Sequence, residues 1–375
     1  MHNQWWTLPG PSRFVDRVVK DLRQSKNVVI GLPNLIPDGI RQATQQRVKK
    51  SSWRWCRVTP QPEYHPLDQL YETLTGESTT EQHVDHFDLA KHDRVRGTIA
   101  WIDLGVSETP ETWVKCMKTY ADSIKRLEPD SPLLLIGVLQ SDHASVTPNG
   151  KPHLSVRAWR NVIQVVDVRN VVERELRKRS FNPTQHQLAV ETIARVALWD
   201  LQLAAQLAFC SLAEITDPFD LLEDYAHAQQ WSVDQEARWE DGTHSRLFGE
   251  PQTHSALCVL QGNLQVVERR IWAAQTGVVL PFLEARLRTL ISRLDPLPPT
   301  WTTTNGTREK IVKRENYELS HVAEILSEDG AADDLTRLVR RLKDMRNRLA
   351  HLESLRPADL EHLSLKAFNT TLNDR

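Results

Sequence analysis

Six residues near the end of the sequence, RNRLAH at 346–351, bring together side chains that suit phosphate chemistry. The apolar residues around them are spaced alternately three and four apart, which predicts an amphipathic helix. They are Leu335, Leu338, Leu342, Met345, Leu349 and Leu352. At about 100° per residue, Arg346, Asn347 and His351 project within an arc of roughly 140° on the side away from this stripe. The sequence therefore predicts a helix with an apolar face and a cationic face that carries one imidazole.

The residue types on the cationic face indicate what chemistry it could perform. A histidine can accept or donate a proton near neutral pH, and an arginine can hold a phosphate and the charge that grows on it. Arg340, Lys343 and Arg348 add positive charge that could bind an RNA backbone. A purely structural interpretation stays open, because Lys, Arg and His also gather at the carboxyl ends of helices, where they interact favourably with the helix dipole.

This motif resembles that of the HEPN superfamily, in which an arginine, often followed by Asn, His or Asp, precedes a histidine by a few residues. Four residues separate Arg346 from His351, Asn347 stands at the second position, and the LESL that follows is similar to the Swt1-type branch. The resemblance implies a helical bundle over 263–375. It also implies metal-independent RNA cleavage, in which the 2′-hydroxyl attacks the adjacent phosphorus.

The same resemblance implies how the site is completed. In this superfamily an acidic or polar residue on an earlier helix assists, and Glu284 in PFLEARLR is the candidate by its position. The site forms where two copies of the motif helix meet, so a homodimer or a larger assembly is expected. No cofactor and no metal ion are expected. Many HEPN domains are non-catalytic, and an inactive bundle remains the alternative.

A second candidate site follows the first predicted strand, in GLPNLIPDGIR at 31–41. A Walker A loop has four residues between its glycines, followed by Lys and then Ser or Thr. Here seven residues separate the glycines, and Ile40 and Arg41 stand where Lys and Ser/Thr belong. Asp103, an acid that ends an apolar strand, could supply the other half of such a site. The layout resembles the inactive STAND-type P-loop domains of prokaryotic conflict systems and implies an NTPase-like fold without NTPase chemistry; an ordinary loop is the alternative.

Three further groups of polar residues are interpreted as structural. The segment 83–93, HVDHFDLAKHD, lacks the spacing typical of a metal-binding helix and is expected to be a solvated polar segment. Ser, Asp and His are adjacent in the segment 141–153, whereas the members of a catalytic triad come from distant segments. The basic segment 168–180, VRNVVERELRKRS, could bind phosphates or form a helix laced with charges of both signs.

The elements that must position these residues change in kind along the chain. Segment 12–25 is predicted to be helical, and the runs 27–33, 98–105, 132–140 and 161–168 are predicted to be buried strands, with a helix at 110–127 between two of them. Strands alternating with helices predict an α/β fold with a doubly wound, mostly parallel sheet. Beyond residue 170 the patterns are helical. A long helical stretch at 263–294, expected to be bent or broken near Gly277 and Pro281, precedes the turn-rich 295–307.

Composition limits the remaining possibilities. A formal net charge of −2 gives no overall field that would draw the chain to nucleic acid or an anionic membrane, so any such binding must be local. The four cysteines lie 60, 94 and 48 residues apart, which fits neither a zinc site nor a disulfide framework, and reduced thiols are expected. The amino-terminal residues lack a signal-peptide core, and the apolar runs are too short to cross a bilayer. A cytoplasmic location is expected.

Together these patterns predict an α/β plus all-α chain in three parts. Residues 1–170 form an NTPase-like α/β domain without a Walker A loop, 171–262 a helical connector, and 263–375 a HEPN-like helical bundle. The expected role is a component of a prokaryotic anti-phage or conflict system, in which RNA and other defence proteins are the partners. The alternative from a different class is a non-catalytic scaffold or adaptor subunit.

Overall fold

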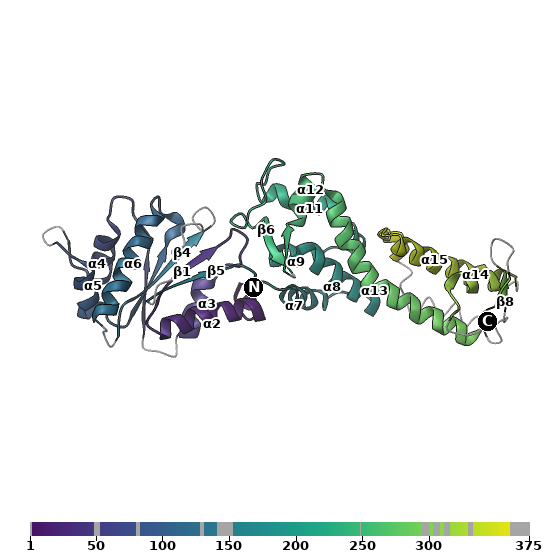
Figure 1. The fold of residues 1–375 in the computed structure, drawn as a ribbon, viewed down its shortest axis with the longest axis horizontal. Helices are drawn as coiled ribbons and strands as arrows, with labels where there is room; N and C mark the ends of the chain where they lie inside the picture. The colour runs from purple at the N-terminus through teal and green to yellow at the C-terminus, as the bar shows by residue number, and fades with distance from the viewer. Residues whose placement is uncertain are drawn as a thin grey trace. The chain divides into compact units, whose positions relative to one another are not determined.

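The computed structural model divides by its contacts into two compact units (Figure 1). Unit 1 is Met1–Asp167 with Gln235–His254, and unit 2 is Val168–Asp234 with Ser255–Arg375. The three-part division expected from the sequence stays a prediction about the domains. The structure describes residues 2–48, 53–79, 83–127, 131–140, 153–247, 249–294, 300–302, 308–310, 316–328 and 333–360.

A five-stranded sheet is the centre of unit 1. Its strands are β1 (Asn27–Leu32), β2 (Arg54–Val58), β3 (Thr98–Asp103), β4 (Leu134–Gln140) and β5 (Leu154–Ala158). They lie in the order β2-β3-β4-β1-β5, and every neighbouring pair is parallel. The three central strands are almost entirely buried, as expected for a parallel sheet covered on both faces. The predicted parallel sheet is therefore confirmed.

Helices cover both faces of this sheet. On one face, α4 (Pro66–Thr75), α5 (His86–Lys91) and α6 (Pro110–Leu127) pack over a cluster that includes Val29, Ala100 and Leu135. Successive strand residues point to opposite faces, so Val28 and Ile30 face the other layer. That layer contains α2 (Pro9–Arg23) and α3 (Ile40–Val48), which pack against each other. The remaining short helices of this part are α1 (His2–Trp5), η1 (Asp93–Val95) and η2 (Leu104–Val106).

The strand predicted at 161–168 is wrong. The β-branched residues there lead into α7 (Val165–Leu176), where Val168, Val171 and Val172 are buried at helical spacing. The fifth strand of the sheet is β5, which precedes the segment 161–168. Its sequence, LSVRA, contains too many polar residues to be recognised as a buried strand.

A hairpin that the sequence patterns did not indicate returns the chain to unit 1. It consists of β6 (His244–Leu247) and β7 (Glu250–Thr253), and Gly249 in the turn has a φ of +84°, which suits glycine. The return segment is fastened to unit 1: the Asn34 N–H donates to the Glu240 carbonyl at 2.9 Å, and the Arg160 guanidinium lies 4.9 Å from the Trp239 ring centroid.

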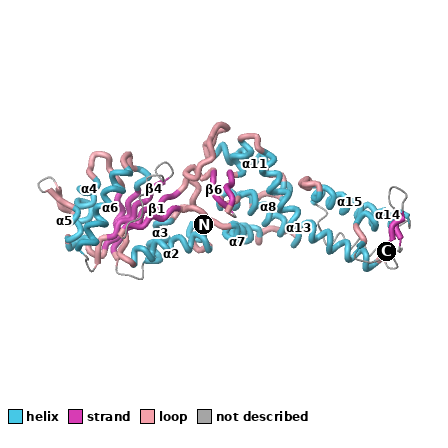
Figure 2. Tube along the Cα trace, viewed as in Figure 1, coloured by secondary structure: helices cyan, strands magenta, loops and turns pink. Residues whose placement is uncertain are grey.

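Helices dominate unit 2 (Figure 2). Besides α7 it contains α8 (Pro183–Ala197), α9 (Leu201–Leu207), α10 (Leu212–Thr216), α11 (Phe219–Ala228), α12 (Ser255–Leu260), α13 (Leu264–Arg293), α14 (Leu319–Glu328), α15 (Asp333–Ala350) and α16 (Pro357–Leu360). A short hairpin of β8 (Thr300–Thr302) and β9 (Arg308–Lys310) occupies part of the predicted turn-rich segment. The helix α13 is continuous with Pro281 inside it, so of the bend or break expected near Gly277 and Pro281 the break does not occur.

One apolar cluster holds α13, α14 and α15 together. It includes Leu283 and Leu287 of α13, Val322 of α14, and Leu342 and Met345 of α15. Of the helices that the structure describes, none combines the length and the apolar composition that crossing a bilayer requires.

Candidate functional site

The predicted amphipathic helix is α15, and its apolar stripe is the face that packs into the bundle. Leu335, Leu342, Met345 and Leu349 are each at most 4% exposed. The stripe ends before its last predicted member, because Leu352 lies beyond the helix and is 71% exposed. Arg346 is exposed and Lys343 and Asn347 are half-buried, so these residues lie beside the apolar stripe, at the edge of the bundle core.

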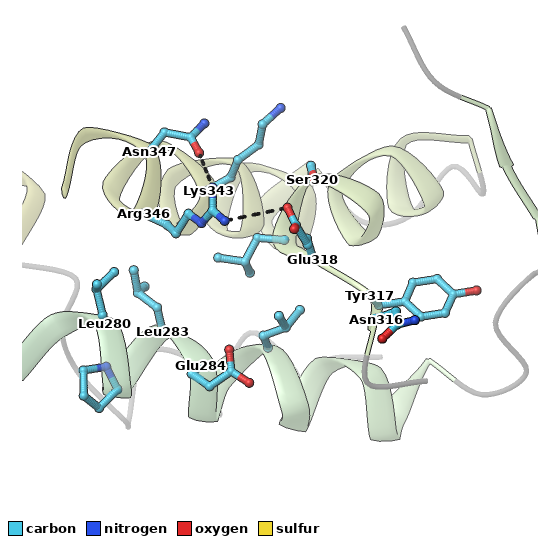
Figure 3. A pocket seen from close by; sticks show the side chains of 13 residues that line it. Leu280, Leu283, Glu284, Asn316, Tyr317, Glu318, Ser320, Lys343, Arg346 and Asn347 are labelled. Carbon is cyan, nitrogen blue, oxygen red and sulfur yellow. Dashed lines mark hydrogen bonds and ion pairs between the residues drawn. The ribbon is translucent and has the colours of Figure 1, made fainter. Parts of the chain in front are cut away.

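A pocket of about 780 Å³ lies between α13, the start of α14 and α15 (Figure 3). Lys343, Arg346 and Asn347 line it from α15, and Glu284 lines it from α13. Four of the seven predicted site residues thus meet in one place. Leu280, Pro281, Leu283 and Leu287 form the apolar wall on α13, and Asn316, Tyr317, Glu318, Leu319 and Ser320 complete the lining.

The charges in this pocket are partly satisfied by one another. The Arg346 Nη2 lies 3.9 Å from a Glu318 carboxylate oxygen, and its Nη1 donates to the Asn347 Oδ1 at 3.4 Å. The Glu284 carboxylate is engaged by Arg288 one turn along α13, at 3.0 Å. Both Arg346 and Glu318 are about half exposed (49% and 58%), so their ion pair is screened by water and easily exchanged for another anion.

His351 does not line the pocket. It follows the last residue of α15, and its backbone N–H donates to the carbonyls of Asn347 and Arg348. Leu352 donates to Leu349 and Glu353 to Arg348, which is the hydrogen-bond pattern of a Schellman cap. Leu352 takes the left-handed position of this cap with a φ of +64°. The exposed His351 side chain is thus on the terminating turn of α15, while Arg346 faces the pocket.

Two of the three predicted RNA-binding residues make contacts within the chain. Arg348 lies 3.2 Å from the Asp359 carboxylate and donates to the Ser354 carbonyl at 2.9 Å, so it ties the end of α15 to the segment that follows. Arg340 is exposed and donates to the Ser327 hydroxyl of α14 at 2.9 Å. Lys343 extends away from α13 at the rim of the pocket (Figure 3).

Glu318 and Tyr317 are pocket residues that the sequence patterns did not identify. Both lie in ENYELS, directly before the first residue of α14. Burial raises the pKa of the Tyr317 hydroxyl, so this hydroxyl stays protonated near neutral pH. It can therefore contribute hydrogen bonds to the site, but no negative charge. The spacing of residues along the sequence does not predict that this segment lies near the motif, because their proximity depends on how α14 packs on α15.

The second candidate site is a pocket of about 420 Å³ at the carboxyl ends of the central strands of unit 1. This is where open α/β sheets bind nucleotides. Asp103 from β3 lines it together with the residues of the loop after β1, so the acid and the loop do meet. Both Asp103 oxygens are occupied, however: one accepts from the Arg57 Nε at 2.6 Å and the other from the Trp101 indole N–H at 2.9 Å.

Several backbone groups of the loop after β1 are unavailable to a phosphate cradle. Such a cradle uses successive backbone N–H groups. Pro33 and Pro37 have none, the Asn34 N–H donates to Glu240, and the Ile36 N–H donates to the Asn34 carbonyl at 3.1 Å. The sheet of this unit is parallel as predicted, but the sequence of the loop lacks the lysine and the hydroxyl that Walker A chemistry needs.

The other predicted constellations have structural roles where the structure describes them. In the segment 83–93, Asp85 caps α5 and exchanges hydrogen bonds with Asp88 in a capping box. Among the described residues, no three His, Cys, Asp or Glu side chains are arranged to hold a metal ion. In 168–180, the cations are largely paired: Arg169 with Glu191 at 2.6 Å and Lys178 with Glu175 at 3.4 Å. Ser141, Asp142 and His143 lie outside the described residues.

Comparisons with known proteins add little to this geometry. No family model and no curated protein sequence matches the chain. The structure is similar to that of the RuvB Holliday junction branch migration motor of Thermotoga maritima, with 12% identity, a TM-score of 0.27, and coverage of 85% of this chain and 82% of that chain. A mutant of the same protein gives 11% identity, a TM-score of 0.31, and coverage of 86% and 96%. With TM-scores this low, the likeness supports no inference about activity.

Proposed function

We propose that the helices α13 to α16 form a metal-independent endoribonuclease of the HEPN type, as one component of a prokaryotic anti-phage or conflict system. The observation that carries the proposal is the meeting of Arg346, Asn347, Lys343 and Glu284 in one pocket. The first three come from a single helix, α15, whereas Glu284 comes from α13, about 60 residues earlier in the sequence. Unit 1, whose first loop lacks the Walker A lysine and hydroxyl, would control the nuclease rather than supply energy to it.

The residues suit cleavage by an internal attack. A base removes the proton of the RNA 2′-hydroxyl, the 2′-oxygen bonds to phosphorus, and the bond to the 5′-oxygen breaks as that oxygen receives a proton. Arg346 would leave Glu318 and hold the phosphate, because a phosphate with charge growing on it is a stronger partner than a half-exposed carboxylate. His351 would move the protons.

A second copy of the chain completes this site. Arg346 faces the pocket and His351 stands on the turn at the end of the same helix, so one chain supplies only part of a two-sided clamp. Two copies meeting at the ends of α15 would bring the histidine of each toward the arginine of the other. We therefore expect the full-length protein to be at least dimeric at micromolar concentration, which light scattering measures.

A non-catalytic scaffold is the second candidate, and one observation favours it. Glu284 and Glu318 place two carboxylates in the same pocket as Arg346, and carboxylates repel a phosphate. In a scaffold, the Arg346–Glu318 pair would only join α15 to α14.

The test is RNA cleavage by the full-length protein in the presence of a metal chelator. His351→Ala should lower the rate by about 10² to 10⁴, the usual contribution of a positioned acid or base. Arg346→Ala should act similarly, and Arg346→Lys should rescue little, because lysine lacks the planar two-pronged donor. Cleavage that survives both alanine variants at equal expression would eliminate the nuclease and leave the scaffold. Cleavage by a strict monomer would contradict the two-copy site.

A further inference from the structure

Three exposed cations form a row on α2, far in sequence from the motifs considered above. Arg13, Arg17 and Lys20 are spaced four and three apart, so they lie within about 60° of one another around the helix. Asp16, the acid beside them, is paired with Arg47 of α3 at 2.9 Å. Among the residues that the structure describes, the three cations have no acidic partner. This surface therefore keeps a local positive charge on a chain whose net charge is −2.

The row lines a pocket of about 660 Å³, together with Asp16, whose charge is balanced by Arg47. Its opposite wall is the loop before α7, where Asn161, Val162 and Gln164 face the cations. The Gln164 side-chain N–H donates to the Asn161 carbonyl at 2.6 Å, which fixes the shape of this loop. The cations thus border a hollow rather than a flat helix surface.

The hollow is held open by a buried carboxylate. Asp167 is fully buried and accepts hydrogen bonds from the backbone N–H groups of Gly10 at 2.9 Å and Gln164 at 2.8 Å. It therefore joins the start of α2 to the loop that forms the other wall. Gly10 permits this close approach, because a Cβ atom there would lie 2.0 Å from the Val162 carbonyl oxygen. The pocket walls are accordingly fixed by interactions within unit 1.

The chemistry of the pocket fits a chain of phosphates. From Arg13 to Lys20 the row rises by about 10 Å along the helix, which is long enough to contact two or three successive phosphates of one strand. A membrane surface fits less well, because the apolar face of α2, with Phe14, Val15 and Val18, is buried in the core of unit 1. The contrasting basic helix α7 has most of its cations paired.

We propose that this pocket on α2 binds the phosphodiester backbone of a nucleic acid strand without reading its base sequence. The binding site is separate from the candidate cleavage site and does not rest on its activity. It would give unit 1 a function of its own, which is to sense or hold a strand by its charge.

The experiment measures fluorescence anisotropy of a short labelled strand with the full-length protein across about 50 to 200 mM salt. The probes are a 2′-O-methyl RNA, which has no 2′-hydroxyl to attack its own backbone, and DNA of the same sequence. The test variant is Arg13→Gln/Arg17→Gln/Lys20→Gln. The matched control is Lys115→Gln/Lys118→Gln/Lys125→Gln, which removes three exposed positive charges from α6 of the same unit.

The test variant should bind at least tenfold more weakly at the low-salt end, and its log–log salt slope should fall by about 2, or about 0.7 for each lost contact. The control should stay within about twofold of the unchanged protein. Each single substitution should lower the slope by about 0.7, which keeps the test valid if the triple variant does not fold. Equal losses in the test and control variants, or no loss in either, would overturn the proposal. Binding of one probe alone would assign the site to RNA or to DNA.

Discussion

Replacing Leu342 with alanine tests whether the apolar stripe of α15 is the core of the motif-bearing bundle. Leu342 is 1% exposed and belongs to the cluster shared by α13, α14 and α15. The substitution removes three buried carbon atoms, worth about 0.8 kcal/mol each, or roughly 2.4 kcal/mol in total. The cavity left behind adds to this, so the free energy of unfolding should fall by roughly 2 to 5 kcal/mol.

Hydrogen–deuterium exchange on peptides from α15 measures this loss locally, which matters because a chain of two units need not unfold in one step. A loss of 2 kcal/mol or more speeds the slowest exchange by at least about 30-fold, since each 1.4 kcal/mol is a factor of ten. Leu352→Ala is the matched control: the same residue type, predicted in the same stripe but 71% exposed, should change stability by no more than about 0.5 kcal/mol. Equal effects of the two substitutions would mean that the packing face of α15 has been wrongly identified.

Three further predictions concern other parts of the chain. Leu352→Gly should raise the denaturant midpoint, with a gain of about 0.5 to 1 kcal/mol, because glycine takes the left-handed cap position at φ +64° without the strain that a Cβ atom adds; a lower midpoint would show that the exposed side chain is needed. The protein should neither bind ATP tightly nor hydrolyse it, and micromolar binding in calorimetry that Asp103→Ala abolishes would contradict this. Burial raises the pKa of the Cys116 thiol to about 12, so at pH 8 only roughly one molecule in 10⁴ carries the reactive thiolate; mass spectrometry should find Cys116 unmodified by iodoacetamide in the native protein and modified after unfolding in urea.

The sequence predicted the central strands of the sheet better than its edges. The strands β1, β3 and β4 are continuous apolar runs because both of their faces are buried. The strands β2 and β5 lie at the edges, carry polar residues such as Arg54 and Arg157, and have mixed burial, so neither gave a recognisable pattern. The apolar run 161–168 is typical of a strand, yet its second half begins the helix α7, because short apolar runs do not distinguish the two structures.

In the candidate site too, the features that depend on one helix could be predicted from the sequence, and those that depend on packing between helices could not. Helical periodicity placed Lys343, Arg346 and Asn347 on one exposed face, because those positions depend only on α15 itself. The ion pair with Glu318 could not be predicted, since it depends on the packing of α14 against α15. The periodicity predicts that His351 belongs to the helical face, but the helix ends one residue before it.

The return of Gln235–His254 to unit 1 has a consequence for how the protein is made. Because a ribosome releases the chain from its amino end, the whole sheet of unit 1 emerges before the residues that fasten its first loop through Asn34 and Glu240. Those residues follow only after the whole first segment of unit 2, Val168–Asp234, has been synthesised. The loop after β1 therefore lacks this hydrogen bond until residue 240 has been synthesised. In a stalled or truncated product that ends before residue 235, the loop would be exposed to chaperones and proteases.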